Sequence, residues 1–90
     1  MVVSYFGMLR DIAGRKEEDW EQPAATVGEL LHRVVAEYGP QFGRWVLDNG
    51  DLLNLAIVLV NGRDVRGLQR LATPLKPTDN VTLFPPVAGG

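Results

Sequence analysis

Residues Thr26 to Gly39 read Thr-Val-Gly-Glu-Leu-Leu-His-Arg-Val-Val-Ala-Glu-Tyr-Gly and carry the clearest structural signal of the chain. The first four residues, from Thr26 to Glu29, form a capping box, in which each side chain satisfies a backbone N–H of the other residue. Apolar residues then recur at helical spacing and form one stripe: Val27, Leu30, Leu31, Val34, Val35 and Tyr38. Gly39 and Pro40 supply the stop. The pattern predicts one amphipathic helix that covers one face of a sheet.

The residues before this helix predict two strands of that sheet. Residues 2–6 are rich in β-branched and aromatic side chains, which is typical of a strand, and Gly7 ends it. Residues 8–14 predict a short helical turn closed by glycine. Residues 16–22 are polar except for Trp20. We expect them to form an edge strand that pairs with the first strand in a hairpin.

The residues after the helix predict three more strands. Residues 56–60 are an apolar run that indicates a buried strand. Asn61-Gly62 is a strong two-residue hairpin signal, so the chain should turn back as a short strand over 63–65. Residues 80–84 predict the last strand, which the following prolines end because proline cannot donate to a ladder.

Two connecting segments carry weaker signals. Residues 41–47 favour a short helix with Trp45 and Val46 packed inward, and residues 48–51 favour a turn. Residues 67–77 contain several helix and strand breakers, so we expect a loop there.

The element order is strand, strand, helix, strand, short strand and strand. One helix against one mixed sheet is a two-layer α+β domain. This order predicts the β-grasp (ubiquitin-like) arrangement, with the last strand central and parallel to the first. We expect a single domain over residues 1–90, with a mobile C-terminal tail over residues 85–90.

Two phenylalanines are expected on the face that the helix leaves open. Strand side chains alternate between faces, and the polar residues mark the open one. Phe84 shares its face with Thr82, and Phe6 shares its face with Ser4. Exposed aromatic side chains that cluster usually mark an interaction surface. The alternatives are that Phe84 folds under its own tail or that the register is inverted.

Composition excludes several classes of function. The 90 residues carry nine basic and eleven acidic side chains spread along the chain, with no basic stripe, so we expect no nucleic-acid partner. No apolar run approaches the roughly 20 residues that span a bilayer, so we expect no membrane partner. Cysteine is absent, which excludes disulfides and thiolate chemistry. No secretory signal is visible, and we expect a cytoplasmic location.

The sequence shows no catalytic or metal-binding constellation. His32 is the single histidine and lies on the polar face of the predicted helix. Asp48 and Asp51 flank a turn without a further carboxylate to complete a metal site. The glycines at 62 and 67 lack the Lys-Ser/Thr of a phosphate loop. We therefore expect no bound cofactor, no metal and no enzyme activity of the chain by itself.

The C-terminal tail carries the candidate reactive group. Pro85, Pro86 and Val87 form a stiff stretch, and Gly89 and Gly90 end the sequence. Because glycine has no Cβ, this tip can enter a channel too narrow for any side chain. We expect the α-carboxylate of Gly90 to be carried into a partner's active site, with Gly89 giving clearance. The alternative is a frayed end or an expression remnant.

From Phe84 to Gly90 the sequence Phe-Pro-Pro-Val-Ala-Gly-Gly resembles the ending of molybdopterin synthase small subunits, the MoaD members of the MoaD/ThiS family of ubiquitin-like sulfur carriers. Tyr5-Phe6 followed by Leu9-Arg10, and Val60-Asn61-Gly62, agree with that family in the expected order. The resemblance covers essentially the whole chain and implies that Phe6, Phe84 and the tail contact partner proteins.

The resemblance also implies a chemistry. An ATP-dependent enzyme related to ubiquitin-activating enzymes adenylates the C-terminal carboxylate of Gly90, so ATP is used by the partner. A sulfur donor system then converts the acyl adenylate to a thiocarboxylate. Inside the large subunit of the synthase, the thiocarboxylate donates sulfur to a pterin precursor of the molybdenum or tungsten cofactor.

One departure from the family leaves the pathway open. Residues 62–72 are longer and more polar than in bacterial synthase subunits. A carrier for thiamine, cysteine or another thio-metabolite is the next candidate, although thiamine carriers are usually shorter. A ubiquitin-like protein modifier would share the acyl adenylate, which a lysine amine would then attack. A binding module without chemistry would not need the last two glycines.

Overall fold

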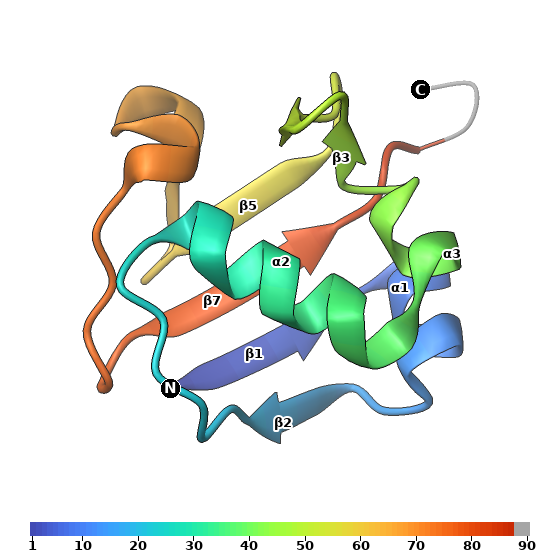
Figure 1. Ribbon diagram of the computed structural model, residues 1–90, viewed down its shortest axis with the longest axis horizontal. Helices are drawn as coiled ribbons and strands as arrows, with labels where there is room; N and C mark the ends of the chain where they lie inside the picture. Colours follow the sequence, from blue (N-terminus) through green and yellow to red (C-terminus); the bar gives the residue numbers. More distant parts are fainter. Residues whose placement is uncertain (88–90) are drawn as a thin grey trace.

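The helix predicted from Thr26 onward is α2 (Val27–Tyr38), which crosses one face of a mixed sheet in the computed structural model (Figure 1). The structure describes residues 1–87. Thr26 Oγ1 accepts a hydrogen bond from the Glu29 backbone N–H at 3.2 Å, as a capping box requires. The Glu29 carboxylate in turn accepts a hydrogen bond from the backbone N–H of Ala25, whereas a capping box would use the N–H of Thr26.

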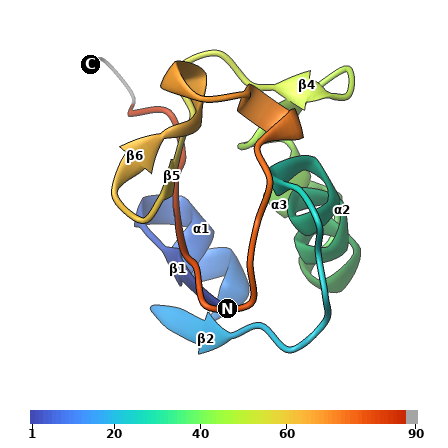
Figure 2. The same ribbon diagram turned by 90° about the vertical axis from the view of Figure 1, so that its left-hand side faces the viewer.

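The main sheet has five strands in the order β2-β1-β7-β5-β6. Their bounds are β1 (Val2–Tyr5), β2 (Glu17–Asp19), β5 (Ile57–Val60), β6 (Arg63–Asp64) and β7 (Asn80–Phe84). β7 is central and runs parallel to β1, whereas the other neighbours are antiparallel. This confirms the predicted β-grasp topology. Viewed from the side, the sheet and α2 form two layers (Figure 2).

Several predicted boundaries were wrong. The edge strand expected over 16–22 is only β2, and the segment expected as a loop over 67–77 contains a 3-10 turn (Arg70–Ala72) that follows another at Val65–Gly67. The short helices are α1 (Gly7–Ala13) and α3 (Pro40–Gly43). Both 3-10 turns are closed by local backbone hydrogen bonds that composition alone does not indicate.

The helix expected over 41–47 ends at Gly43, and the chain continues into a small hairpin. Its strands are β3 (Leu47–Asp48) and β4 (Asp51–Leu52). Asn49 and Gly50 between them have φ of 51° and 81°, the positive values that two-residue hairpin turns need. The turn predicted at 48–51 is therefore confirmed, but its flanking strands were missed.

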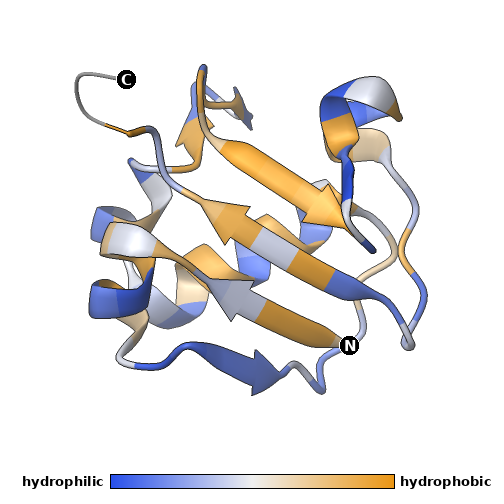
Figure 3. Ribbon diagram, turned by 180° about the vertical axis from the view of Figure 1, so that it is seen from behind, coloured by the Kyte–Doolittle hydropathy of each residue, from blue (hydrophilic) through white to orange (hydrophobic). Residues whose placement is uncertain are grey.

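The core lies between α2 and the sheet. Alternate strand residues are fully buried there, including Val3 and Tyr5 of β1 and Val81 and Leu83 of β7. They pack against the apolar stripe of the helix. The intervening residues point to the other side, where no helix of residues 1–87 lies in front of β5 and β7 (Figure 3). The predicted face assignment is confirmed. Within residues 1–87, no helix combines the length and apolarity that a membrane crossing would require.

Candidate functional site

The two phenylalanines predicted on the open face stack on each other. Phe84 is the last residue of β7, and Phe6 directly follows β1 in extended conformation. Parallel pairing of Tyr5 with Leu83 places these strand ends side by side, and the Phe6 N–H donates to the Leu83 carbonyl at 3.1 Å. The ring centroids are 4.5 Å apart with an interplanar angle of 21°. The parallel register of β1 and β7 therefore brings the two rings together.

A cation covers one ring of the pair. The guanidinium carbon of Arg10, on α1, lies 5.3 Å from the centroid of Phe6. Its Nε also donates to the Tyr5 carbonyl at 3.2 Å, which fixes the side chain at the sheet edge. A guanidinium over an aromatic face is attracted by the ring quadrupole. The site thus presents an aromatic surface with a positive rim.

Residues 85–87 form the tail root, where the chain leaves the sheet. A hollow of about 350 Å³ lies between this tail root and the side chains of Met8 and Trp45. Gly7 has a φ of +55°, and a Cβ at that position would lie 3.2 Å from Pro85 Cγ. Glycine therefore allows α1 to start directly beside the tail root.

The exposed large apolar side chains of residues 1–87 gather at this end of the molecule. They are Phe6, Met8, Leu55, Ile57 and Val87. We call these five residues the apolar rim. Ile57 belongs there because it is the cross-strand partner of Phe84. Of these five residues, only Phe6 and Val87 were predicted as binding residues from the sequence. Alternation with buried Val58 would also have assigned Ile57 to the open face.

The predicted reactive residues Gly89 and Gly90 lie outside the described residues. The other predicted positions, Phe6, Phe84 and the tail root, are brought together by the fold. Whether they contact a partner stays a prediction.

A cluster of two tyrosines, a carboxylate and an arginine lies on the covered side of the sheet. The hydroxyls of Tyr5 and Tyr38 both donate to Glu18 Oε1 at 2.5 Å, and Arg15 pairs with Glu18 Oε2 at 3.1 Å. Burial raises the pKa of Tyr5 far above its ordinary value, and the Glu18 carboxylate raises it further. The same two causes raise the pKa of Tyr38. These shifts keep both hydroxyls protonated as hydrogen-bond donors, which is a structural role.

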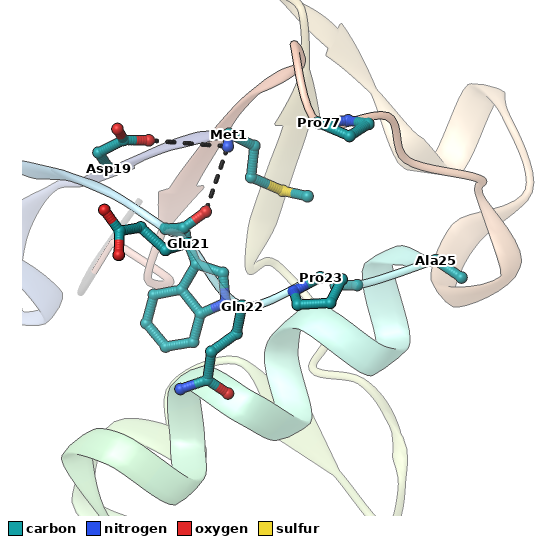
Figure 4. Close-up of a pocket in the computed structure, with 9 residues that line it drawn as sticks. Met1, Asp19, Glu21, Gln22, Pro23, Ala25 and Pro77 are labelled. Atoms are coloured by element: carbon teal, nitrogen blue, oxygen red, sulfur yellow. Dashed lines mark hydrogen bonds and ion pairs between the residues drawn. The ribbon is translucent and has the colours of Figure 1, made fainter.

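A larger hollow of about 520 Å³ lies at a distance from the tail root, beside the N-terminal residue (Figure 4). The Met1 ammonium donates to the Trp20 carbonyl at 3.2 Å and lies 3.7 Å from the Asp19 carboxylate. Pro23 and Pro77 line the far wall. Among residues 1–87, none of the predicted site residues lines this hollow. Across the described part of the chain, no group of three or more His, Asp and Glu side chains is placed to hold a metal ion.

Comparison with known proteins decides the family. The model of the ThiS family matches residues 3–90. The chain belongs to the ThiS family. The family comprises small ubiquitin-like proteins that are named as sulfur carriers or modifiers.

Individual relatives of this ThiS-family chain carry different names. Small archaeal modifier protein 3 of Haloferax volcanii is 40% identical over 87 residues, covering 96% of this chain and 94% of the relative. A chain in the crystal structure of the Amycolatopsis orientalis BexX/CysO complex is 32% identical, with a TM-score of 0.83 and coverage of 99% and 98%. A putative molybdopterin converting factor subunit 1 of Pyrococcus furiosus is 31% identical, with a TM-score of 0.74 and coverage of 96% and 95%.

Proposed function

We propose that this chain is a sulfur carrier whose C-terminal carboxylate, on Gly90, is converted to a thiocarboxylate. Membership of the ThiS family supports the carrier role. The observation that carries the proposal is the apolar rim around the tail root, which gives a partner protein a surface to bind directly beside the reactive end.

The proposed chemistry takes place in partner active sites. The carboxylate attacks the α-phosphorus of ATP and releases pyrophosphate, which gives an acyl adenylate. A hydrosulfide equivalent from a sulfur donor system then attacks the acyl carbon, and AMP leaves. One oxygen of the carboxylate has been exchanged for sulfur without net oxidation or reduction. The thiocarboxylate is the better nucleophile and donates this sulfur to the acceptor.

We propose a pterin precursor of the molybdenum or tungsten cofactor as the acceptor, with a synthase large subunit as partner. The Phe-Pro-Pro-Val-x-Gly-Gly ending and the likeness to the Pyrococcus furiosus protein support this choice. Thiamine, cysteine or another thio-metabolite is the alternative product. Conjugation to protein lysines is a second candidate function, which the 40% identity to a small archaeal modifier protein favours.

Intact mass spectrometry of the protein purified from its native host tests the carrier role. We expect a species heavier by about sixteen mass units, the difference between sulfur and oxygen, located in the C-terminal peptide. A variant that lacks Gly89 and Gly90 is the control and should show no such species. If the native protein never gains this mass, even when the host overproduces its sulfur donor system, the proposal is wrong.

Two further measurements separate the candidate outcomes. Loss of the molybdopterin cofactor in a strain without the gene would support the proposed acceptor, whereas intact cofactor levels would contradict it. Conjugation would appear in tryptic digests as substrate lysines that carry the C-terminal peptide of this chain. That peptide would begin at Leu71, because trypsin cleaves after Arg70 and does not cleave between Lys76 and Pro77.

A further inference from the structure

Leu55 combines two unfavourable features, because it is both strained and exposed. Its φ is +70°, a value that side-chain-bearing residues rarely adopt, and 61% of its surface is exposed. It occupies the third position of a four-residue turn that the Ala56 N–H closes by donating to the Leu53 carbonyl at 3.1 Å. Glycine or asparagine is favoured at a turn position with positive φ. Stability alone therefore does not explain a leucine here.

The turn is held by a side chain from the polar segment over residues 62–72. One terminal nitrogen of Arg66, Nη2, donates to the Leu53 carbonyl at 2.9 Å, and the other, Nη1, donates to the Ala56 carbonyl. The two carbonyls flank Leu55 in sequence. The planar guanidinium therefore bridges both ends of the turn and fixes the backbone that presents the leucine side chain. We call this arrangement the Arg66 clamp.

The presented leucine lies at the end of the molecule where the tail leaves. Leu55 precedes β5, whose first residue Ile57 pairs with Phe84 at the end of β7. The turn before β5 and the tail root lie at the same end of the sheet in Figures 1 and 3. Leu55 therefore extends the apolar rim beyond the aromatic pair, on the far side of β7 from Phe6.

The length of the tail determines what must cover this surface. Three residues separate Val87 from the Gly90 carboxylate, and a fully extended chain spans only about 3.5 Å per residue. Any active site that reacts at this carboxylate therefore lies within roughly 10 Å of Val87. A protein that brings its active site so close also covers the surface around the tail root, and it requires an apolar surface to match the apolar rim.

We propose that Leu55, positioned by the Arg66 clamp, is an anchor for the protein that adenylates the C-terminal carboxylate, and that it inserts into an apolar depression beside that protein's nucleotide site. This inference rests on the proposed function. It assigns a role to the 62–72 segment, which supplies the clamp. A leucine on a backbone that is held in place binds at lower entropic cost than one on a mobile loop, so the strained turn serves pre-organisation.

Substitution of Leu55 separates anchoring from stability. Leu55→Gly removes the side chain and relieves the strained φ, and Leu55→Asn tolerates this φ while replacing the apolar surface with an amide. We expect both variants to keep the melting temperature within about 4 °C of the wild type. Both should raise the KM for the carrier about tenfold, with little change in kcat, because they remove an interface anchor.

The assay is ATP–pyrophosphate exchange by the host's ubiquitin-activating-like enzyme, with the full-length carrier as substrate. Leu68→Gln is the matched control, because Leu68 is a partly exposed leucine of the 62–72 segment that lies beside the β5–β6 turn, away from the tail. Its KM should stay at the wild-type value. Arg66→Gln should raise KM about threefold in the wild-type background. In the Leu55→Gly background it should add nothing, since the clamp acts only through the leucine.

A wild-type KM for both Leu55 variants would overturn the inference, as would an equal KM increase in Leu68→Gln. Unchanged adenylation combined with slower sulfur donation by the thiocarboxylate would also overturn it, because Leu55 would then contact the protein that binds the sulfur acceptor instead. Failure of the proposed function is distinguishable from all of these outcomes. In that case, the wild-type carrier would support no pyrophosphate exchange and no thiocarboxylate would form.

Discussion

Tyr5 and Phe6 are adjacent in sequence, yet they belong to two aromatic clusters with opposite surroundings. The Tyr5 ring packs edge-on against Tyr38 and Phe42, with centroids 5.8 and 5.7 Å away; Tyr5 and Phe42 are fully buried, and Tyr38 is partly buried. Phe6 stacks on Phe84 on the open side, where 37% of its surface is exposed. Alternation along one strand thus directs one aromatic residue to the core and the next to the surface.

The contrast teaches which cluster folding requires. The buried cluster links β1 to α2 and α3, and its hydroxyl groups hold Glu18 of the edge strand β2. The exposed pair connects only the ends of β1 and β7, which backbone hydrogen bonds already hold together. An exposed aromatic pair that folding does not require is better explained by binding. Substitutions in the two clusters should therefore change different properties.

The largest effect on stability is expected from the buried cluster. Phe42→Ala removes a fully buried ring and leaves a cavity, which should lower the free energy of unfolding by about 3–5 kcal/mol. Urea denaturation followed by circular dichroism measures this change. If the free energy of unfolding falls by less than about 1 kcal/mol, the cluster of Tyr5, Tyr38 and Phe42 is not part of the stabilising core.

The contribution of the Tyr5 hydroxyl to the free energy of unfolding is smaller and depends on pH. The pKa of Tyr5 is raised by burial and by Glu18, so the folded protein keeps the Tyr5 proton at a pH where the unfolded chain releases it. The resulting stabilisation is complete below about pH 10, the ordinary tyrosine pKa, and is lost progressively as the pH rises above it. Unfolding free energy should therefore fall steeply in alkali.

Tyr5→Phe is the variant that tests this pH dependence. It removes one hydrogen bond to a carboxylate and should cost about 1–2 kcal/mol near neutral pH. Its alkaline decline should be shallower than that of the wild type, with Tyr38 responsible for the remainder. Melting temperatures from pH 8 to 11 would reveal parallel curves if the Tyr5 hydroxyl does not contribute.

The exposed aromatic pair was largely predictable from sequence, because it follows from period-two alternation in two strands. Residues 2–6 and 80–84 gave the right faces, and the parallel pairing of first and last strands placed Phe6 beside Phe84. The β-grasp topology followed from the capped helix between a hairpin and the later strands. These features depend on local pattern and chain order, which the sequence states directly.

Features that depend on distant contacts were not predictable. Residues 52–60 are nearly all apolar, so nothing local separates the strained Leu55 from the strand that follows it. Its conformation is held by Arg66, which lies eleven residues further along the chain. The β3–β4 hairpin was missed for a different reason. Asn49-Gly50 carries the same dipeptide signal as Asn61-Gly62, but its flanking strands are too short to show alternation.

The smallest expected effect on stability, in Phe6→Ala, sharpens the comparison most. Both substitutions, Phe6→Ala and Phe42→Ala, remove one phenyl ring, so the two variants are chemically matched. Because Phe6 is partly exposed and loses mainly its stacking with Phe84, the cost should be about 1 kcal/mol or less. The KM for pyrophosphate exchange should nevertheless rise about tenfold, as expected when a partner loses a central aromatic contact. If Phe6→Ala instead destabilises the chain as strongly as Phe42→Ala and leaves KM unchanged, the exposed pair is structural, and the difference between the two clusters is one of degree of burial alone.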